Sequence, residues 1–140
     1  MAIKMHSSVP VFLVADVAAT AKWYRDRLGF QFDHFAAQEP YAWAGLQLGD
    51  AELFVLSLEG HKHQSAFRAR AAGGWDAYFR MTGLLAFFEA IRAGVKVLCP
   101  PTRRPYGLTE FIIEDPNEYA LGFSEQIPAD MPQAPAATEA

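Results

Sequence analysis

The sequence has little cysteine, no excess of basic residues and no long hydrophobic run, and each absence excludes a class of protein. The single cysteine, Cys99, rules out a disulfide within the chain, and its apolar setting in VKVLCPP predicts a buried, unreactive thiol. No apolar run approaches the roughly 18 residues of a membrane span, and the amino-terminal MAIKMHSSVP lacks the apolar core of a signal peptide. We therefore expect a cytoplasmic protein with no membrane partner.

The charge balance and the missing motifs exclude further functions. A formal net charge of −4 disfavours nucleic acid and other polyanions as partners and permits a neutral or cationic one. The chain has no serine in a nucleophile elbow, no glycine-rich phosphate loop and no stripe of basic and aromatic residues. His61 and His63 are of a metal-ligating type, but they lie in a polar stretch without a nearby carboxylate or cysteine, so we expect them to be solvated.

The first half of the chain predicts one strand, one helix and three further strands. Hydrophobic residues make up 51% of the sequence, which suffices for a sizeable core at this length. The segment VPVFLVADV alternates as a strand does, Asp16 can cap the helix that follows, and Gly29 can end it. The segments FQFDHF, YAWAGLQLG and AELFVLSL then predict three strands, so the order is βαβββ.

The second half repeats this order. DAYFRM predicts a strand, Thr82 is the expected helix cap, Gly94 ends the helix, and VKVLC, TEFIIE and YALGF predict the last strands. When the sequence is aligned with itself at a shift of 65 residues, Gly29 aligns with Gly94 and Asp50 with Asp115, which indicates an internal repeat. We expect one α+β domain over residues 1–127, with modules at about 7–59 and 74–125, a polar linker at about 60–73 and a disordered tail at 128–140.

The segment EDPNEYALGF, residues 114–123, has two residues in unexpected places. Asp115-Pro116-Asn117 begins a type I turn, and the next position favours a residue that tolerates positive φ, yet the chain has Glu118 there. Its side chain is expected to point into solvent, so Glu118→Gly should stabilise the fold by up to roughly 1 kcal/mol. Gly122 interrupts the apolar alternation of the last strand, where a glycine contributes no side chain to packing.

The paired βαβββ modules, opened by VPVFLVADVAATAKWYRDRLGF and closed by PYGLTEFIIEDPNEYALGF, resemble the vicinal oxygen chelate superfamily. This superfamily contains glyoxalase I, ring-cleaving dioxygenases, fosfomycin-modifying enzymes and bleomycin-resistance proteins, and the opening is most similar to the bleomycin-resistance type. The resemblance covers about residues 7–125 and implies a curved sheet around a cleft. Fold alone does not specify an activity.

Metal-using members of the family hold a divalent ion with four side chains, usually two His and two Glu. By the resemblance these positions correspond to Pro10, Ser57, Asp76 and Gly122 in this chain. Only Asp76 offers a good ligand, whereas a catalytic metal usually needs about three protein ligands and an open position. We therefore expect no bound metal and no cofactor. A glycine at 122 would leave space in the cleft for a bulky ligand.

The aromatic and polar residues that the resemblance places at the cleft are the candidate ligand-binding residues. They are Trp43, Phe54, Trp75, Asp76, Tyr78, Arg104 and Tyr106. Aromatic rings could stack on the ligand, and the Asp76 carboxylate could face a positive charge or a hydrogen-bond donor. Each also has a plain structural interpretation, because a strand aromatic is often part of the core and an arginine near Glu110 can simply pair with it.

Three functions remain open at this point, one of them a stress or resistance accessory protein with no tight ligand. The leading one is a metal-free homodimer of the bleomycin-resistance type, with an antibiotic-resistance role, that sequesters an aromatic or cationic small molecule. In such proteins the first strand is exchanged between subunits, and Pro10 could stiffen that arm. The alternative is an enzyme of the glyoxalase superfamily. It would be a metal-dependent lyase or dioxygenase, or a metal-free isomerase with Asp76 or Glu110 as the base.

Overall fold

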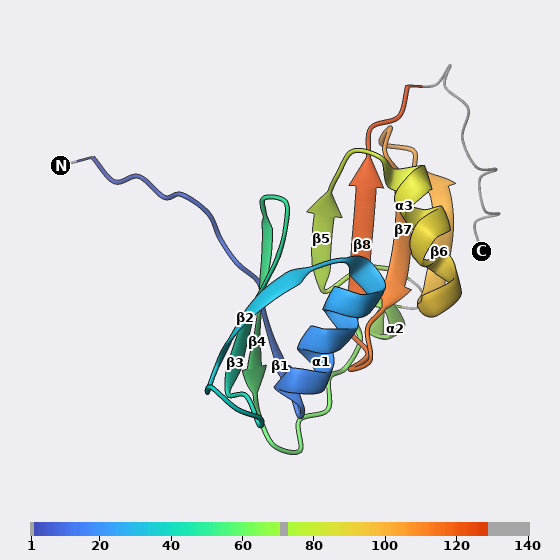
Figure 1. Cartoon of the computed structure of the whole chain (residues 1–140). Helices are drawn as coiled ribbons and strands as arrows, with labels where there is room; N and C mark the ends of the chain where they lie inside the picture. Colours follow the sequence, from blue (N-terminus) through green and yellow to red (C-terminus); the bar gives the residue numbers. More distant parts are fainter. Residues whose placement is uncertain (1, 71–72, 129–140) are drawn as a thin grey trace. The chain divides into compact units, whose positions relative to one another are not determined.

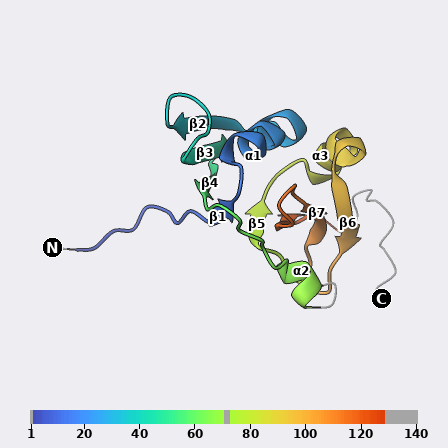
Figure 2. The same ribbon diagram turned by 90° about the horizontal axis from the view of Figure 1, so that it is seen from below.

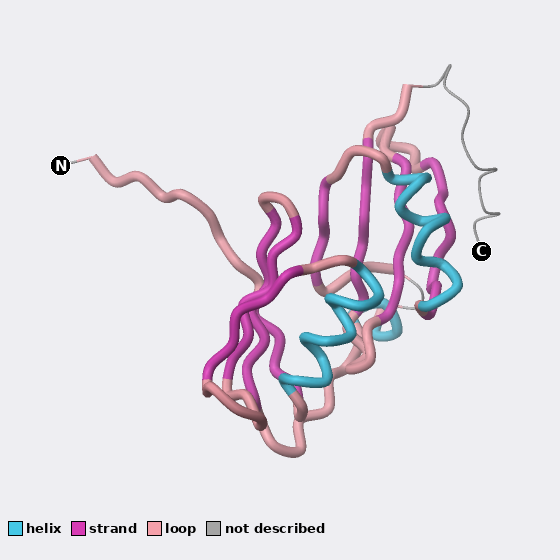
Figure 3. Tube along the Cα trace, in the orientation of Figure 1, coloured by secondary structure: helices cyan, strands magenta, loops and turns pink. Residues whose placement is uncertain are grey.

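The computed structural model describes residues 2–70 and 73–128, and the chain divides between His61 and Lys62 into two compact units. Each unit contains one four-stranded sheet with a helix against one of its faces, as Figures 1 and 3 show. The α+β class and the twofold βαβββ order predicted from the sequence are confirmed. Beyond Pro128, the predicted tail lies outside the described residues.

The first unit is built from β1 (Val11–Val14), α1 (Val17–Trp23), β2 (Gln31–Phe35), β3 (Trp43–Leu48) and β4 (Ala51–Ser57). A turn of π-helix, η1 (Tyr24–Leu28), extends α1. The sheet order is β1-β4-β3-β2, in which β1 and β4 are parallel and the other neighbours antiparallel. The Asp16 side chain caps α1 by accepting the Ala19 N–H at 3.0 Å, and Gly29 ends η1 at φ 85°, both as expected.

Strand alternation determines which face of this sheet packs on the helix. Residues at every second position of the strands are fully buried against α1 and η1, whose inward residues are Val17, Ala21, Tyr24 and Leu28. The buried strand residues are Phe12, Val14, Ala44, Leu46, Leu53 and Val55. Burying one such leucine contributes roughly 1.5–3 kcal/mol. The residues between them therefore lie on the opposite, open face of the sheet.

The second unit contains α2 (Ala66–Ala69), β5 (Ala77–Arg80), α3 (Leu84–Ile91), β6 (Lys96–Arg103), β7 (Thr109–Glu114) and β8 (Ala120–Glu125). A short 3₁₀ turn, η2 (Arg92–Gly94), follows α3. The sheet order is β5-β8-β7-β6, with β5 parallel to β8 and the other neighbours antiparallel. Figure 2 shows α3 and α2 on opposite sides of this sheet.

The predicted cap of α3 is wrong by one residue. Gly83 occupies the N-cap position at φ 85°, and it has no side chain to accept the first backbone N–H groups. The Glu125 carboxylate accepts them instead, from Gly83 N at 3.1 Å and Leu84 N at 2.9 Å. A partner 41 residues away in the chain replaced the local cap that Thr82 was expected to supply.

The segment predicted to be a polar linker is partly ordered. Ser65 is buried and accepts the Arg68 N–H at 3.4 Å at the start of α2. Among the described residues, no helix is long and apolar enough to cross a membrane.

Candidate functional site

Aromatic packing identifies which face of the second sheet points away from α3. Phe79, Phe111 and Phe123 form one row across the sheet, and Phe111 packs on Phe88 of α3 with ring centroids 5.1 Å apart. Successive strand residues point to opposite faces, so Tyr78 and Gly122 point away from α3. The candidate site is built on this face.

Trp75 and Tyr78 form an aromatic shelf over Gly122. Their ring centroids are 4.6 Å apart with planes inclined by 33°. A Cβ added to Gly122 would lie 3.1 Å from Tyr78 Cδ1 and 3.4 Å from Trp75 Cγ. The expectation that Gly122 leaves space for a ligand is therefore wrong, because these two rings already fill that space. Trp75 itself stays 37% exposed.

Glu110 brings three of the predicted residues together. Its side chain is buried and faces the same side as Tyr78, one row along the strand register. The Tyr78 hydroxyl donates to Glu110 Oε2, the Tyr106 hydroxyl donates to Oε1 at 2.6 Å, and Arg104 Nε donates to Oε1 at 3.3 Å. A buried carboxylate requires such compensation, since burying a charge without partners is strongly unfavourable. Both oxygens are thus engaged within the protein.

The two tyrosines of this cluster are held in their protonated form. Burial is the main reason that the pKa of Tyr78 and of Tyr106 is raised above its ordinary value, and the hydrogen bond to Glu110 acts in the same direction. At neutral pH both phenols therefore carry the proton that they donate to Glu110.

Cys99 is half-buried beside the cluster, with its Sγ 3.5 Å from Arg104 Nη2. The predicted burial is thus only partial, because the irregular pairing of β6 with β7 around this residue opens the strand.

The open face of the first sheet carries a comparable arrangement. Trp43 and Phe54 meet edge to face, with centroids 5.3 Å apart. A Cβ on Gly45 would lie 2.6 Å from Trp43 Cη2, so the tryptophan ring lies directly over this glycine. Sequence analysis missed Gly45, although a glycine inside a strand is a known sign of a close approach. Two of the predicted residues thus form a second aromatic pair over a glycine.

Asp76 is engaged by its own unit. Its Oδ2 accepts the Ala120 N–H at 2.8 Å, and its Oδ1 lies 3.0 Å from His63 Nε2. The His63 ring stacks on Tyr119 with centroids 3.7 Å apart, so the expectation of a solvated histidine is wrong. The stacking on Tyr119 and the Asp76 carboxylate hold the His63 ring against the protein. Neither partner is near His63 in the sequence. Asp76 therefore ties the segment before β5 to β8.

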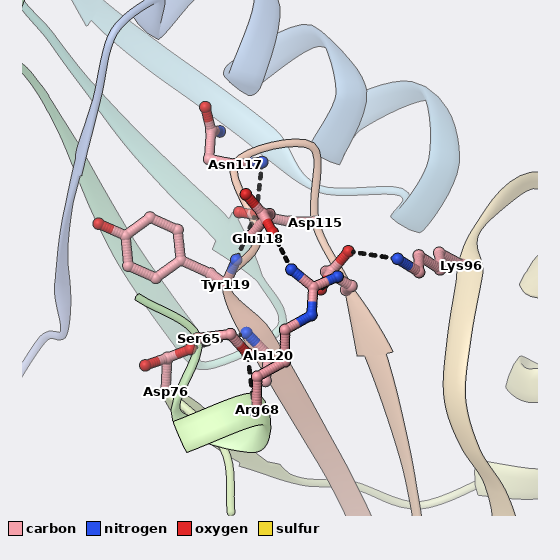
Figure 4. A network of polar contacts seen from close by, with 10 residues as sticks. Ser65, Arg68, Asp76, Lys96, Asp115, Asn117, Glu118, Tyr119 and Ala120 are labelled. Carbon is pink, nitrogen blue, oxygen red and sulfur yellow. Dashed lines mark hydrogen bonds and ion pairs between the residues drawn. The ribbon is translucent and has the colours of Figure 1, made fainter. Parts of the chain in front are cut away.

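A polar network holds α2 against the turn between β7 and β8 (Figure 4). Arg68 pairs with Glu118 and also reaches Glu114, with Nη2 2.9 Å from Oε1. Glu114 is buried, and Lys96 Nζ lies 3.1 Å from its other oxygen. Glu118 has φ 68°, as the turn predicted, but its half-exposed carboxylate is paired rather than solvated. The pairing residue lies 50 positions away, beyond the reach of local sequence reasoning.

The residues at the family's metal positions do not fit a metal ion. Pro10 has no ligating side-chain atom, and Ser57 ends β4 with a weak one. At Gly122 the shelf rings occupy the volume that a side chain would need, and the Asp76 carboxylate is already engaged. Within residues 2–70 and 73–128, no three His, Cys, Asp or Glu side chains gather as a metal site requires.

A surface hollow of about 360 Å³ lies elsewhere on the first unit, around the start of α1. Its walls include Asp16, Glu39, Tyr41 and Ser57. Asp16 caps α1 and Glu39 pairs with Lys22, so both of these carboxylates have partners. The hollow contains none of the seven predicted ligand-binding residues.

Comparison with known proteins bears on what this arrangement does. The model of the family described as "Glyoxalase/Bleomycin resistance protein/Dioxygenase superfamily" matches residues 8–123. Among the curated proteins, none matches the chain.

Three solved structures illustrate the likeness. A glyoxalase-related enzyme from Clostridium phytofermentans has 17% identity and a TM-score of 0.70, and the match covers 89% of this chain and 98% of that one. A bleomycin resistance determinant encoded on the transposon Tn5 has 21% identity and a TM-score of 0.67, with 89% and 100% covered. The bleomycin-binding protein of bleomycin-producing Streptomyces verticillus, complexed with copper(II)-bleomycin, has 24% identity and a TM-score of 0.64, with 87% and 97% covered. At such identities the likeness concerns the fold.

Proposed function

The chain belongs to the Glyoxalase/Bleomycin resistance protein/Dioxygenase superfamily, and on this premise we propose that it is a metal-free binding protein that sequesters a planar aromatic, cationic small molecule without changing it. The observation that carries the proposal is the shelf of Trp75 and Tyr78 over Gly122, at a position where metal-using relatives would place a ligating side chain. A stacking surface replaces a metal ligand at this point of the fold.

The exposed ring of Trp75 suits a flat, positively charged ligand. Indole has the most favourable ring face for a cation, and stacking contributes about 0.5–1.5 kcal/mol beyond the area that it buries. The formal net charge of −4 favours the approach of a cation over that of an anion. Trp43 and Phe54 offer a second aromatic surface on the other sheet for the same ligand class.

The enzymatic alternative lacks a supporting observation in the site. Glu110 would have to accept a proton from a substrate, yet both of its oxygens already accept hydrogen bonds from Tyr78, Tyr106 and Arg104. Asp76 is similarly engaged by Ala120 and His63. We therefore place the roles of Trp43, Phe54, Trp75, Tyr78, Arg104 and Tyr106 in binding, and that of Asp76 in holding the shelf segment.

We also propose that the protein acts as a homodimer in the cytoplasm, in which the first strand can be exchanged between subunits. In the first sheet β1 stands at one end of the strand order, beside β4, and a strand at the end of a sheet is the one that subunits can exchange without disturbing the order of the others.

The proposal is tested with acridine orange, a planar aromatic cation that fluoresces. Saturable binding with a fixed stoichiometry, and recovery of unmodified dye by liquid chromatography, is the expected result. Trp75→Leu should weaken binding about fivefold, which is the loss of roughly 1 kcal/mol of stacking. Trp23→Leu, on α1 in the first unit, is the matched control and should leave binding unchanged. Conversion of the dye, or equal binding by both variants, would contradict the proposal.

A further inference from the structure

The Tyr106 hydroxyl points its proton at Glu110, so its oxygen can only accept a hydrogen bond from a ligand. Glu110 Oε1 accepts the Tyr106 hydroxyl at 2.6 Å, and a phenol has only one proton to donate. The phenol cannot also donate to a ligand. What remains on the Tyr106 oxygen is acceptor capacity alone.

Tyr106 and Tyr78 differ in what occupies that remaining capacity. Tyr78 likewise donates to Glu110, but its oxygen is also engaged in a side-chain hydrogen bond with the buried Ser124. No residue in the described part of the chain donates to the Tyr106 oxygen, and although its bond to Glu110 is partly buried, Tyr106 as a residue is 59% exposed. Tyr106 is therefore the member of the pair that a ligand can address.

The Tyr106 hydroxyl is connected to the aromatic shelf through Glu110. Tyr106 and Tyr78 bind the two oxygens of the same carboxylate, and Tyr78 stacks on Trp75. A planar molecule lying on Trp75 can thus bring an edge group to the Tyr106 oxygen. Only an N–H or O–H group on that edge would form a hydrogen bond there.

We propose that Tyr106, oriented by Glu110, is a specificity-determining residue that selects planar ligands carrying an amino N–H donor on their edge over ligands in which that amino group is blocked or replaced by an acceptor. This inference rests on the proposed function and adds the ligand class to it. The donor bond from Tyr106 to Glu110 also polarises the phenol oxygen and strengthens it as an acceptor.

The test compares two dyes with the same ring system and charge. Both cations carry one N–H on the ring nitrogen, so they differ only at the amino groups, which have N–H donors in proflavine and are dimethylated in acridine orange. The quantity measured is the ratio of their dissociation constants, by fluorescence titration, in the wild-type protein and in Tyr106→Phe. Because one neutral hydrogen bond is involved, Tyr106→Phe should weaken proflavine binding about 3- to 10-fold and leave acridine orange binding unchanged.

Two further variants separate orientation from a general structural effect. Glu110→Gln keeps an oxygen that accepts from Tyr106 and Arg104 at the Oε1 position, so the dye ratio should stay near that of the wild type. Tyr41→Phe, a tyrosine of the first unit outside the shelf, is the matched control and should also leave the ratio unchanged.

The outcomes distinguish the two proposals. An unchanged dye ratio in Tyr106→Phe, with both dyes bound, overturns the selection by Tyr106 and leaves the binding function standing. Failure of the wild-type protein to bind either dye overturns the binding function and the selection with it. Loss of the ratio in Glu110→Gln, with the fold intact by circular dichroism, overturns orientation by an accepted hydrogen bond alone, because that variant keeps the acceptor.

Discussion

Glu118→Gly is predicted to leave the free energy of unfolding within about 0.5 kcal/mol of the wild type, because three contributions nearly cancel. Glu118 has φ 68°, and the left-handed conformation costs a residue with a Cβ roughly 1–2 kcal/mol, which glycine avoids. The greater freedom of glycine in the unfolded chain opposes this gain by about 0.4–1 kcal/mol. Loss of the half-exposed ion pair with Arg68 removes another ~0.2–1 kcal/mol.

A second variant separates the backbone contribution from the charge. Glu118→Gln keeps the Cβ and the strained backbone but removes the negative charge, so it should destabilise the protein by about 0.2–1 kcal/mol. Glu118→Gly should then be more stable than Glu118→Gln by roughly 0.8 kcal/mol, taken as the left-handed penalty less the glycine entropy. On local sequence alone the glycine variant would have been more stable than the wild type.

Urea unfolding followed by circular dichroism measures these differences, in low salt and in 1 M NaCl. The same substitutions in an Arg68→Met background complete a double-mutant cycle, in which Glu118→Gln should have almost no effect. If Glu118→Gly proved less stable than Glu118→Gln, the argument from backbone strain would be refuted. A Glu118→Gln effect that persists without Arg68, or that is insensitive to salt, would refute the assigned ion pair.

Four further predictions concern the site and the assembly. Tyr78 and Tyr106 keep protons that the unfolded chain releases near pH 10, so the stability they provide is complete below that pH and is lost as the pH rises through their raised pKa values. Absorbance at 295 nm should therefore show tyrosines that lose their protons only above the usual pH, and fewer of them in Tyr106→Phe. An unchanged titration in that variant would contradict this. Gly122→Ala places a Cβ 3.1 Å from Tyr78 Cδ1 and should destabilise the protein by about 1–3 kcal/mol, so an unaltered urea midpoint would argue against the shelf geometry. Elemental analysis of protein purified without chelators should find no stoichiometric divalent metal, and about one Zn, Mn, Ni or Fe per chain, with binding lost on chelation, would overturn the metal-free proposal. Light scattering should give the mass of a dimer, and a monomer at all concentrations would exclude it.

The order of elements was encoded locally and was therefore readable from the sequence. Each of the correctly predicted features depends on residues within a few positions of one another. These features are the strand alternation, the cap at Asp16, the helix end at Gly29 and the turn before Glu118. The same kind of signal failed at Gly83, where the cap comes from Glu125 on another element. Local chemistry thus determined which elements form, and roughly where they begin and end.

The composition of the site depended on sheet register, which no local pattern contains. Aromatic residues near the ends of strands were recognisable as candidates, and the pairing of Arg104 with Glu110 was one of the interpretations considered. Only the alignment of β5, β7 and β8 placed Tyr78 opposite Gly122 and directed its hydroxyl, with that of Tyr106, to one carboxylate.

The space over Gly122 shows the same division between local and tertiary information. The sequence determined that a glycine interrupts this strand, but the rings of Trp75 and Tyr78 that require it come from more than 40 residues earlier in the chain. A contact of that separation is decided when the strands pair, because a shift of one residue would turn each of these side chains to the other face of the sheet.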